Sequence, residues 1–128
     1  MDRKIFMTAS LFGGIGVVLG AFAAHGFKPL LSDSAFDSFN TGIRYQMYHA
    51  FLLFFVGITT HIKPKQKSTL FKLILTGILL FSGSIYFLST NSLTAFDFKI
   101  IGIITPIGGM LLIASWALLF ICFLRIKK

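Results

Sequence analysis

The chain has 128 residues, of which 55% are hydrophobic and only 12% are charged, and its formal net charge is +8 at pH 7. Soluble domains carry about 25% charged residues, so this composition excludes a water-soluble globular protein, and it equally excludes a disordered chain. Every formal charge lies outside four stretches, which cover residues 5–27, 45–62, 73–96 and 100–124. Because a bilayer core about 30 Å thick needs about 20 apolar residues per helix, the sequence predicts an all-α, polytopic integral membrane protein.

Residues 5–24 are predicted to form the first span. Small residues recur along it at helical spacing, and such a ridge lets another helix approach closely; its members are Gly13, Gly16, Gly20 and Ala24. A basic start at Arg3 followed by an apolar run also has the form of a secretory signal. The run is longer than a usual signal core, so we expect the span to be retained.

Residues 26–44 form the one sizeable segment between predicted spans. Pro29 interrupts the helical pattern, and the Ser-Asp-Ser sequence at 32–34 is typical of a helix N-cap. Apolar residues then recur on one helical face, at Ala35, Phe36, Phe39 and Ile43. The pattern predicts a short amphipathic helix that lies at the outer membrane interface and bends near Gly42 into the next span.

Three further spans are predicted, at residues 44–62, 69–89 and 100–124. The last one contains Pro106, which lies in the first helical turn or else kinks the helix. Gly108 and Gly109 follow it and are predicted to allow close helix packing. The expected fold is an antiparallel four-helix transmembrane bundle that forms a single domain over residues 1–128.

The basic residues predict the orientation of the chain. If the N-terminus is cytoplasmic, nine Lys and Arg residues lie on the inner side, and only Lys28, Arg44 and Lys99 lie on the outer side. Positive residues favour the cytoplasmic side, so both termini are expected there, with the protein in the cytoplasmic membrane. The basic residues do not alternate with aromatic ones along a stripe, so the lipid bilayer, and not nucleic acid, is the expected partner.

In this topology every span places its polar residues in its outer half, and the inner halves hold mainly Leu, Ile, Phe and Val. Polar groups at membrane depth usually face the bundle interior, and Tyr45, Tyr48 and His49 share a helix face because of their spacing. We therefore expect an outer-leaflet pocket that binds a small polar or anionic ligand or a lipid. Its candidate residues are His25, Arg44, Tyr45, Tyr48, His49, Ser82, Ser84 and Tyr86.

Each candidate residue also has a structural interpretation. Arg44 can extend to the lipid head groups, the tyrosines can form an aromatic belt, and the serines can bond their own helix. His25 and His49 can form a hydrogen-bonded structural pair, or they can hold haem or a metal ion. Because no Cys or acidic residue stands near these two histidines, the sequence predicts no metal site and no cofactor.

Catalysis is not expected from the sequence. The four acidic residues lie near the N-terminus or in connections, so no span carries a carboxylate for a proton relay. Ser84 and His49 would make a nucleophile and a base, but no third group is identifiable. The sequence also has no phosphate-binding loop and no zinc-protease motif.

Four blocks of the sequence resemble one protein family. They are residues 20–26, 44–50, 80–86 and 105–109, the last followed by Trp116. In this order, and over essentially the whole chain, they resemble the bacterial inner-membrane proteins known as domain of unknown function 423. Ala23 stands where that family usually has glycine, which is a small-for-small change. The resemblance implies a four-helix protein of the bacterial inner membrane without an extra domain, and it implies no activity.

Three functions follow as hypotheses. The first is binding of a ligand or lipid in the outer pocket, with a role as a transport element. The second is a structural subunit or assembly factor that packs the small-residue ridge of the first span against a larger membrane complex. The third is a haem or metal carrier. A bundle of this size has little room for an aqueous pathway, so transport would call for a homo-oligomer.

Overall fold

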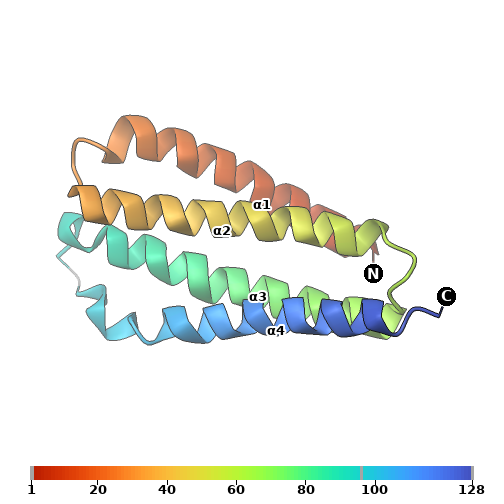
Figure 1. The fold of residues 1–128 in the computed structure, drawn as a ribbon. Coiled ribbons are helices and arrows are strands. Elements are labelled where there is room, and N and C mark those ends of the chain that lie inside the picture. Colours follow the sequence, from red (N-terminus) through yellow and green to blue (C-terminus); the bar gives the residue numbers. More distant parts are fainter. Residues whose placement is uncertain (1, 96, 128) are drawn as a thin grey trace.

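The computed structural model describes residues 2–95 and 97–127, and all regular structure in these ranges is helical. The long helices are α1 (Asp2–Phe22), α2 (Asp33–Ile58), α3 (Pro64–Ser89) and α4 (Ile104–Leu124), and the short ones are η1 (Ala23–Phe27), η2 (Asn91–Leu93) and η3 (Phe98–Ile101). The chain reverses direction between successive long helices, so both termini lie at the same end of the molecule (Figure 1). We call this the terminal end, and we call the end with the α1–α2 connection the distal end.

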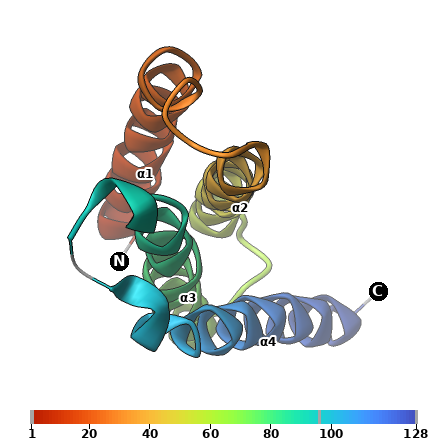
Figure 2. The ribbon, with the colours of Figure 1, turned by 90° about the vertical axis from the view of Figure 1, so that its left-hand side faces the viewer.

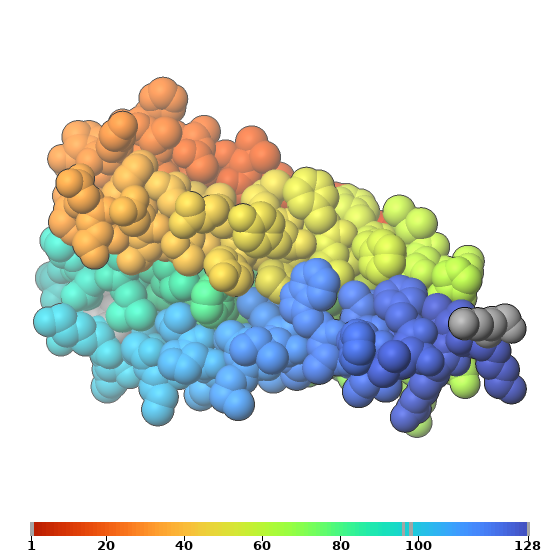
Figure 3. Space-filling model, viewed as in Figure 1, coloured from red at the N-terminus to blue at the C-terminus, as the bar shows by residue number. Residues whose placement is uncertain are grey.

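The long helices are stacked in the order in which they occur in the chain. α2 packs against α1 and α3, and α3 packs against α2 and α4. Viewed from the distal end, α1 and α4 lie on opposite sides of the molecule with α2 and α3 between them (Figure 2). In the space-filling view α3 is visible between α2 and α4 towards the distal end, whereas α2 and α4 meet towards the terminal end (Figure 3).

Three segments are long and apolar enough to cross a membrane by length and composition, namely Asp2–Phe27, Pro64–Ser89 and Lys99–Leu124. α2 has 26 residues but is not among them. Its first half carries polar residues, including Arg44, Gln46 and His49, which lower its hydropathy. With three such segments, and with only helical regular structure in the described ranges, the structure confirms a membrane-type helical protein.

α2 corrects the expected interfacial helix. The predicted short helix and the predicted second span, which the sequence joins through a bend near Gly42, make one α-helix, which begins at Asp33. The Ser32 hydroxyl caps it by accepting a hydrogen bond from the Ala35 N–H at 3.1 Å. Gly42 does not break the helix: a Cβ there would lie 2.7 Å from Cε1 of Tyr86, so this glycine allows α2 and α3 to approach.

Other helix ends also differ from the sequence prediction. α2 ends at Ile58 and α3 begins at Pro64, where proline fits because the first helical N–H needs no partner. α4 begins at Ile104, so Pro106 lies in its first turn and causes no kink. α1 passes at Ala23 into the π-helix η1, in which the Lys28 N–H donates to the Ala23 carbonyl at 2.9 Å.

Glycines mark the closest contacts between the long helices. A Cβ on Gly108 would lie 2.7 Å from the carbonyl carbon of Leu80, which means that α4 touches the backbone of α3 there. A Cβ on Gly77 would lie 2.5 Å from the Leu112 side chain, and one on Gly57 would lie 2.5 Å from the Phe6 ring. These contacts surround a core of buried apolar side chains from all four helices, including Ile5, Leu53, Ile74 and Leu112.

The predicted packing residues behave differently from one another. Gly16 lies against the Met47 side chain, and Gly109 is at ordinary contact distance, 3.5 Å, from the Phe81 ring. Cβ atoms on Gly13 and Gly20 would meet nothing within 4 Å, and Ala24 is exposed. Most of the expected ridge on α1 therefore faces away from the other helices of this chain.

A buried lysine ties the helices together at the terminal end. The Lys67 ammonium donates to the Gly57 carbonyl at 2.9 Å and to the Asp2 carboxylate at 3.2 Å. Lys67 is on α3, Gly57 is in the last turn of α2, and Asp2 begins α1. A cation is favoured at the carbonyl end of a helix, so this contact stabilises the end of α2 as well as the ion pair.

Candidate functional site

A buried glutamine links three helices in the distal half of the molecule. Gln46, on α2, is only 2% exposed. Its side-chain amide donates to the Phe12 carbonyl of α1 at 2.8 Å, and its carbonyl oxygen accepts from the Tyr86 hydroxyl of α3 at 2.6 Å. The amide thus uses a donor and an acceptor on opposite neighbours, which satisfies it among apolar surroundings.

Two buried serines on α3 add contacts to both neighbouring helices. The Ser82 hydroxyl donates to the Gly42 carbonyl of α2 at 2.7 Å. The Ser84 hydroxyl lies 2.5 Å from the Thr105 hydroxyl of α4 and 3.0 Å from the Phe81 carbonyl of its own helix. Both serines therefore have hydrogen-bond partners within the chain.

His49 joins α2 to α4. The Trp116 indole N–H donates to its Nε2 at 3.1 Å, and its Nδ1 lies 2.7 Å from the Tyr45 carbonyl. Because an indole N–H only donates, Nε2 must accept, so the neutral ring carries its proton on Nδ1 and donates it to Tyr45. A metal ion or haem would have to displace one of these bonds.

The eight predicted ligand residues divide into two groups. His49, Ser82, Ser84 and Tyr86 take part in the interhelical hydrogen bonds just described. The other four, His25, Arg44, Tyr45 and Tyr48, are exposed. The eight residues do not come together in one pocket.

The exposed residues have contacts of their own. Arg44 donates to the Thr41 hydroxyl one turn earlier at 2.9 Å. The Tyr45 and Tyr48 rings contact each other edge to face, with centroids 5.8 Å apart. His25 lies on η1 and does not pair with His49. In the described parts of the chain, no three His, Cys, Asp or Glu side chains gather in a metal-binding group.

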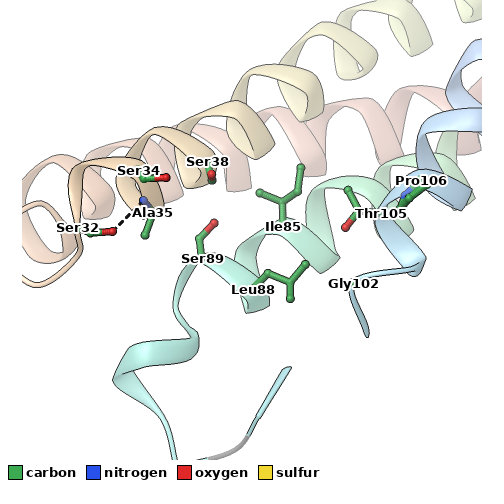
Figure 4. A pocket seen from close by; sticks show the side chains of 10 residues that line it. All are labelled: Ser32, Ser34, Ala35, Ser38, Ile85, Leu88, Ser89, Gly102, Thr105 and Pro106. Atoms are coloured by element: carbon green, nitrogen blue, oxygen red, sulfur yellow. Dashed lines mark hydrogen bonds between the residues drawn. The ribbon is translucent and has the colours of Figure 1, made fainter. Parts of the chain in front are cut away.

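A pocket of about 540 Å³ opens at the distal end, where α2 and α4 diverge over the end of α3 (Figure 4). None of the eight predicted residues lines it. Four serines and a threonine supply hydroxyl groups, and small or apolar residues supply the rest. The lining residues are Ser32, Ser34, Ala35, Ser38, Ile85, Leu88, Ser89, Gly102, Thr105 and Pro106.

Ser89 distinguishes this pocket from the hydrogen-bonded interior. It is only 6% exposed, and its hydroxyl has no hydrogen-bond partner among the described residues. The hydroxyl projects from α3 towards the first turns of α2 (Figure 4). A buried hydroxyl without a partner costs about 1–3 kcal/mol, so its retention in the pocket wall calls for an explanation.

Partial signals for these residues are present in the sequence. The pattern predicts a helix cap at Ser32 and Ser34 and the end of a span at Ser89, but their meeting depends on how α2 packs against α3. Gln46 lies in the predicted second span and is not among the candidate ligand residues. Its amide at membrane depth between two tyrosines was the available signal.

Comparison with known proteins identifies the family. The family model "Protein of unknown function (DUF423)" matches residues 19–109. The UPF0382 inner membrane protein YgdD of Escherichia coli is 30% identical, over 99% of this chain and 94% of its own length. The UPF0382 membrane protein YwdK of Bacillus subtilis is 36% identical, over 92% of this chain and 94% of its own length. No solved structure matches the chain.

These matches also give the environment of the protein. A UPF0382 membrane protein of Haemophilus influenzae is 37% identical over 91% of this chain and 90% of its own length. The relatives are named as membrane proteins, and three segments here have the length and hydropathy of membrane spans. The resemblance carried by the four sequence blocks is confirmed: the chain belongs to the DUF423 family of membrane proteins.

Proposed function

We propose that the protein is a four-span membrane protein that binds a small amphipathic ligand, such as a membrane lipid, in the serine-lined pocket at its distal end. The observation that carries the proposal is the buried, unpartnered Ser89 hydroxyl in the wall of a pocket of about 540 Å³. A ligand that supplies the missing hydrogen bond would offset the cost of burying this group.

The proposal of four spans depends on α2. Its 26 residues extend over about 39 Å, which is enough to cross a bilayer core of about 30 Å. Its buried polar side chains, Gln46 and His49, bond to α1, α3 and α4, so they need no water. Exposed apolar side chains on its second half, such as Phe51, Phe55 and Ile58, suit contact with lipid.

An even number of crossings would place both termini on one side of the membrane. The excess of Lys and Arg near the terminal end favours the cytoplasm, so the pocket would open towards the outer leaflet. Reporter fusions at each terminus test this topology. Two cytoplasmic termini are expected, whereas termini on opposite sides would mean that α2 does not cross.

The pocket lining defines the class of ligand. Its polar groups are neutral hydroxyls, and none of its lining residues is charged. Ile85 and Leu88 provide apolar contact on one side of it. An uncharged hydrogen-bonding group attached to a hydrocarbon part fits this lining better than an anion, and the glycerol region of a lipid has that chemistry. The proposed role is therefore binding and not catalysis.

Native mass spectrometry of protein extracted with its surrounding lipid tests the ligand. A stoichiometric adduct is expected on the wild-type protein, and it should be lost in Ser89→Ala and in Ala35→Leu, which narrows the pocket from α2. Ser115→Ala is the matched control, because Ser115 is also buried but donates to the Leu112 carbonyl of its own helix. A bare wild-type protein, or an adduct unchanged by all three substitutions, would contradict the proposal.

A second function is favoured by α1. Its Gly13 and Gly20 have open space where a Cβ would lie, and Leu11, Val17 and Val18 beside them are exposed. This face suits a structural subunit or assembly factor that packs against another membrane protein. Gly20→Leu should then abolish association with a co-purifying subunit and leave the pocket adduct in place.

A further inference from the structure

A second, smaller pocket lies at the terminal end and has the opposite chemistry. It has a volume of about 220 Å³ and lies between the α2–α3 connection and the end of α4. Three of its lining residues are basic and none is acidic; the lining consists of His61, Lys63, Gln66, Cys122, Arg125 and Ile126. We call this the basic notch.

Among residues 2–95 and 97–127, no acidic side chain pairs with the cations of the basic notch. The ion pair found among residues 2–95 and 97–127 is that of Lys67 with Asp2. The other three acidic residues are Asp33, Asp37 and Asp97, and they belong to the distal half of the molecule. No acidic side chain in the described ranges therefore neutralises the positive charge of the notch, and an anion would be attracted to it.

Local structure positions Lys63 and Arg125 on two sides of the notch. Lys63 is the residue before α3, and its N–H is bonded by the Gln66 side chain at 3.2 Å, which holds the connection against the helix start. The first turn of α3 adds the partial positive charge of a helix N-terminus. Arg125 approaches from the other side, as the residue that follows α4. Its planar guanidinium can donate two parallel hydrogen bonds to a phosphate.

We propose that the basic notch binds a phosphate group, and that this phosphate belongs to the headgroup of an anionic phospholipid. Two exposed apolar side chains at the end of α4 lie beside the notch: Ile126 lines it, and Ile121 is one helical turn before Arg125. An acyl chain can lie along these apolar side chains while its phosphate contacts Lys63 and Arg125. A free phosphate ion would gain only the second of these contacts. The proposal does not depend on the serine-lined pocket.

The test uses the full chain in nanodiscs of phosphatidylcholine that contain phosphatidylglycerol as a minor component. Native mass spectrometry then measures the phosphatidylglycerol retained per protein. The double substitution Lys63→Gln and Arg125→Gln removes two charge-assisted contacts, so retention should fall about tenfold or more. The control, Lys65→Gln with Lys127→Gln, removes the same net charge from two exposed residues that do not line the notch, and retention should stay near the wild-type value.

Two results would overturn the proposal. An equal loss of phosphatidylglycerol in both double variants would mean that net charge alone attracts the lipid. Binding of inorganic phosphate in pure phosphatidylcholine discs, together with displacement of phosphatidylglycerol by millimolar phosphate, would assign the notch to a soluble anion. Ser89→Ala should leave phosphatidylglycerol retention unchanged, so failure here and failure of the distal-pocket proposal are distinguishable.

Discussion

At the terminal end a buried ammonium, that of Lys67, has both a carboxylate and a carbonyl as partners, whereas at the distal end a buried hydroxyl, that of Ser89, has none. The first group is far more costly to bury without a partner than the second. The chain therefore provides partners for the Lys67 ammonium, which would be too costly to bury alone. It leaves the Ser89 hydroxyl unpaired, and a hydrogen bond from a ligand would be enough to offset the cost of burying that hydroxyl.

The packing of α2 against α4 also differs between the two ends. Towards the terminal end α2 and α4 meet (Figure 3). There Lys67 of α3 bonds to Asp2 of α1 and to Gly57 of α2. Towards the distal end α2 and α4 separate, and the pocket opens between them. A terminal half whose helices are joined through Lys67, together with an open distal pocket, suits the proposed binding at one end of the molecule. Substitutions in the two halves test whether this difference is real.

The largest effect is expected for Gly108→Ala, which tests whether the close backbone contact between α3 and α4 is essential for stability. A Cβ there would collide with the backbone of α3 near Leu80 and Phe81, and backbone cannot rotate away as a side chain can. We expect a loss of about 3 kcal/mol, at the upper end of overpacking costs, measured as unfolding in detergent.

Gly109→Ala is the matched control for this substitution. Its Cβ would lie 3.5 Å from the Phe81 ring, which is ordinary contact, and alanine favours the helix by about 1 kcal/mol over glycine. Stability should therefore be unchanged or slightly higher. If Gly108→Ala were as stable as Gly109→Ala, the backbone contact between α3 and α4 would tolerate movement and would not hold the two helices in place.

Lys67→Met tests how much the hydrogen bonds of Lys67 at the terminal end contribute to stability. The substitution leaves the Gly57 carbonyl and the Asp2 carboxylate without their donor. We expect a loss of about 1–3 kcal/mol, mostly from the buried carbonyl, because Asp2 is half exposed and solvent screens its charge. Thermal unfolding in detergent measures it.

Two companion variants show which Lys67 contact matters. Asp2→Asn should cost less than 1 kcal/mol, since it removes the more exposed contact. Lys65→Met, at an exposed position two residues earlier on α3, should change stability little. If Lys67→Met and Lys65→Met were equally stable, the contacts of Lys67 with α1 and α2 would contribute nothing to the free energy of unfolding.

Tyr86→Phe tests the hydrogen-bonded interior that lies between the two ends. It removes the donor to Gln46 and should cost about 1 kcal/mol. A double-mutant cycle with Gln46→Leu should show coupling between the two residues, because each substitution leaves the other group without this bond. Tyr48→Phe is the control, since the Tyr48 side chain is 56% exposed. Additive effects would mean that the Tyr86–Gln46 contact contributes nothing of its own.

The sequence predicted the long helices because membrane spans leave a strong signal in the spacing of charges. α1, α3 and α4 each correspond to a predicted span. The expectation that polar groups at membrane depth face the bundle interior agrees with the interhelical hydrogen bonds of Ser82, Ser84 and Tyr86, although these residues are predicted as ligand residues. Near Gly42 the sequence predicts a bend between a short helix and the second span, whereas the structure has one helix there. A glycine that bends a helix and one that lets a neighbour approach look alike in a sequence.

Helix rotation explains why the candidate site was only partly predicted. Tyr45 and His49 are four residues apart and share a face, yet the boundary between the buried and exposed sides of α2 passes between them. Hydropathy alone does not specify the rotation of a helix about its axis finely enough to place that boundary. The serines of the pocket were separated by more than 50 positions in the sequence, and only the packing of α2 against α3 brings Ser38 and Ser89 to one pocket.

The smallest effect on stability is expected for Ser89→Ala, which tests directly whether the unpartnered hydroxyl at the distal end awaits a ligand. In delipidated detergent the substitution removes a hydroxyl that has no partner, so stability should be unchanged or about 1 kcal/mol higher. In native lipid a bound ligand stabilises the wild type, so there the variant should be the less stable of the two. Ser115→Ala should instead lose stability in both media, because its hydroxyl is bonded at 2.6 Å. If Ser89→Ala were equally destabilised in both media, the hydroxyl would serve the fold itself, and the distal end would be as closed as the terminal end.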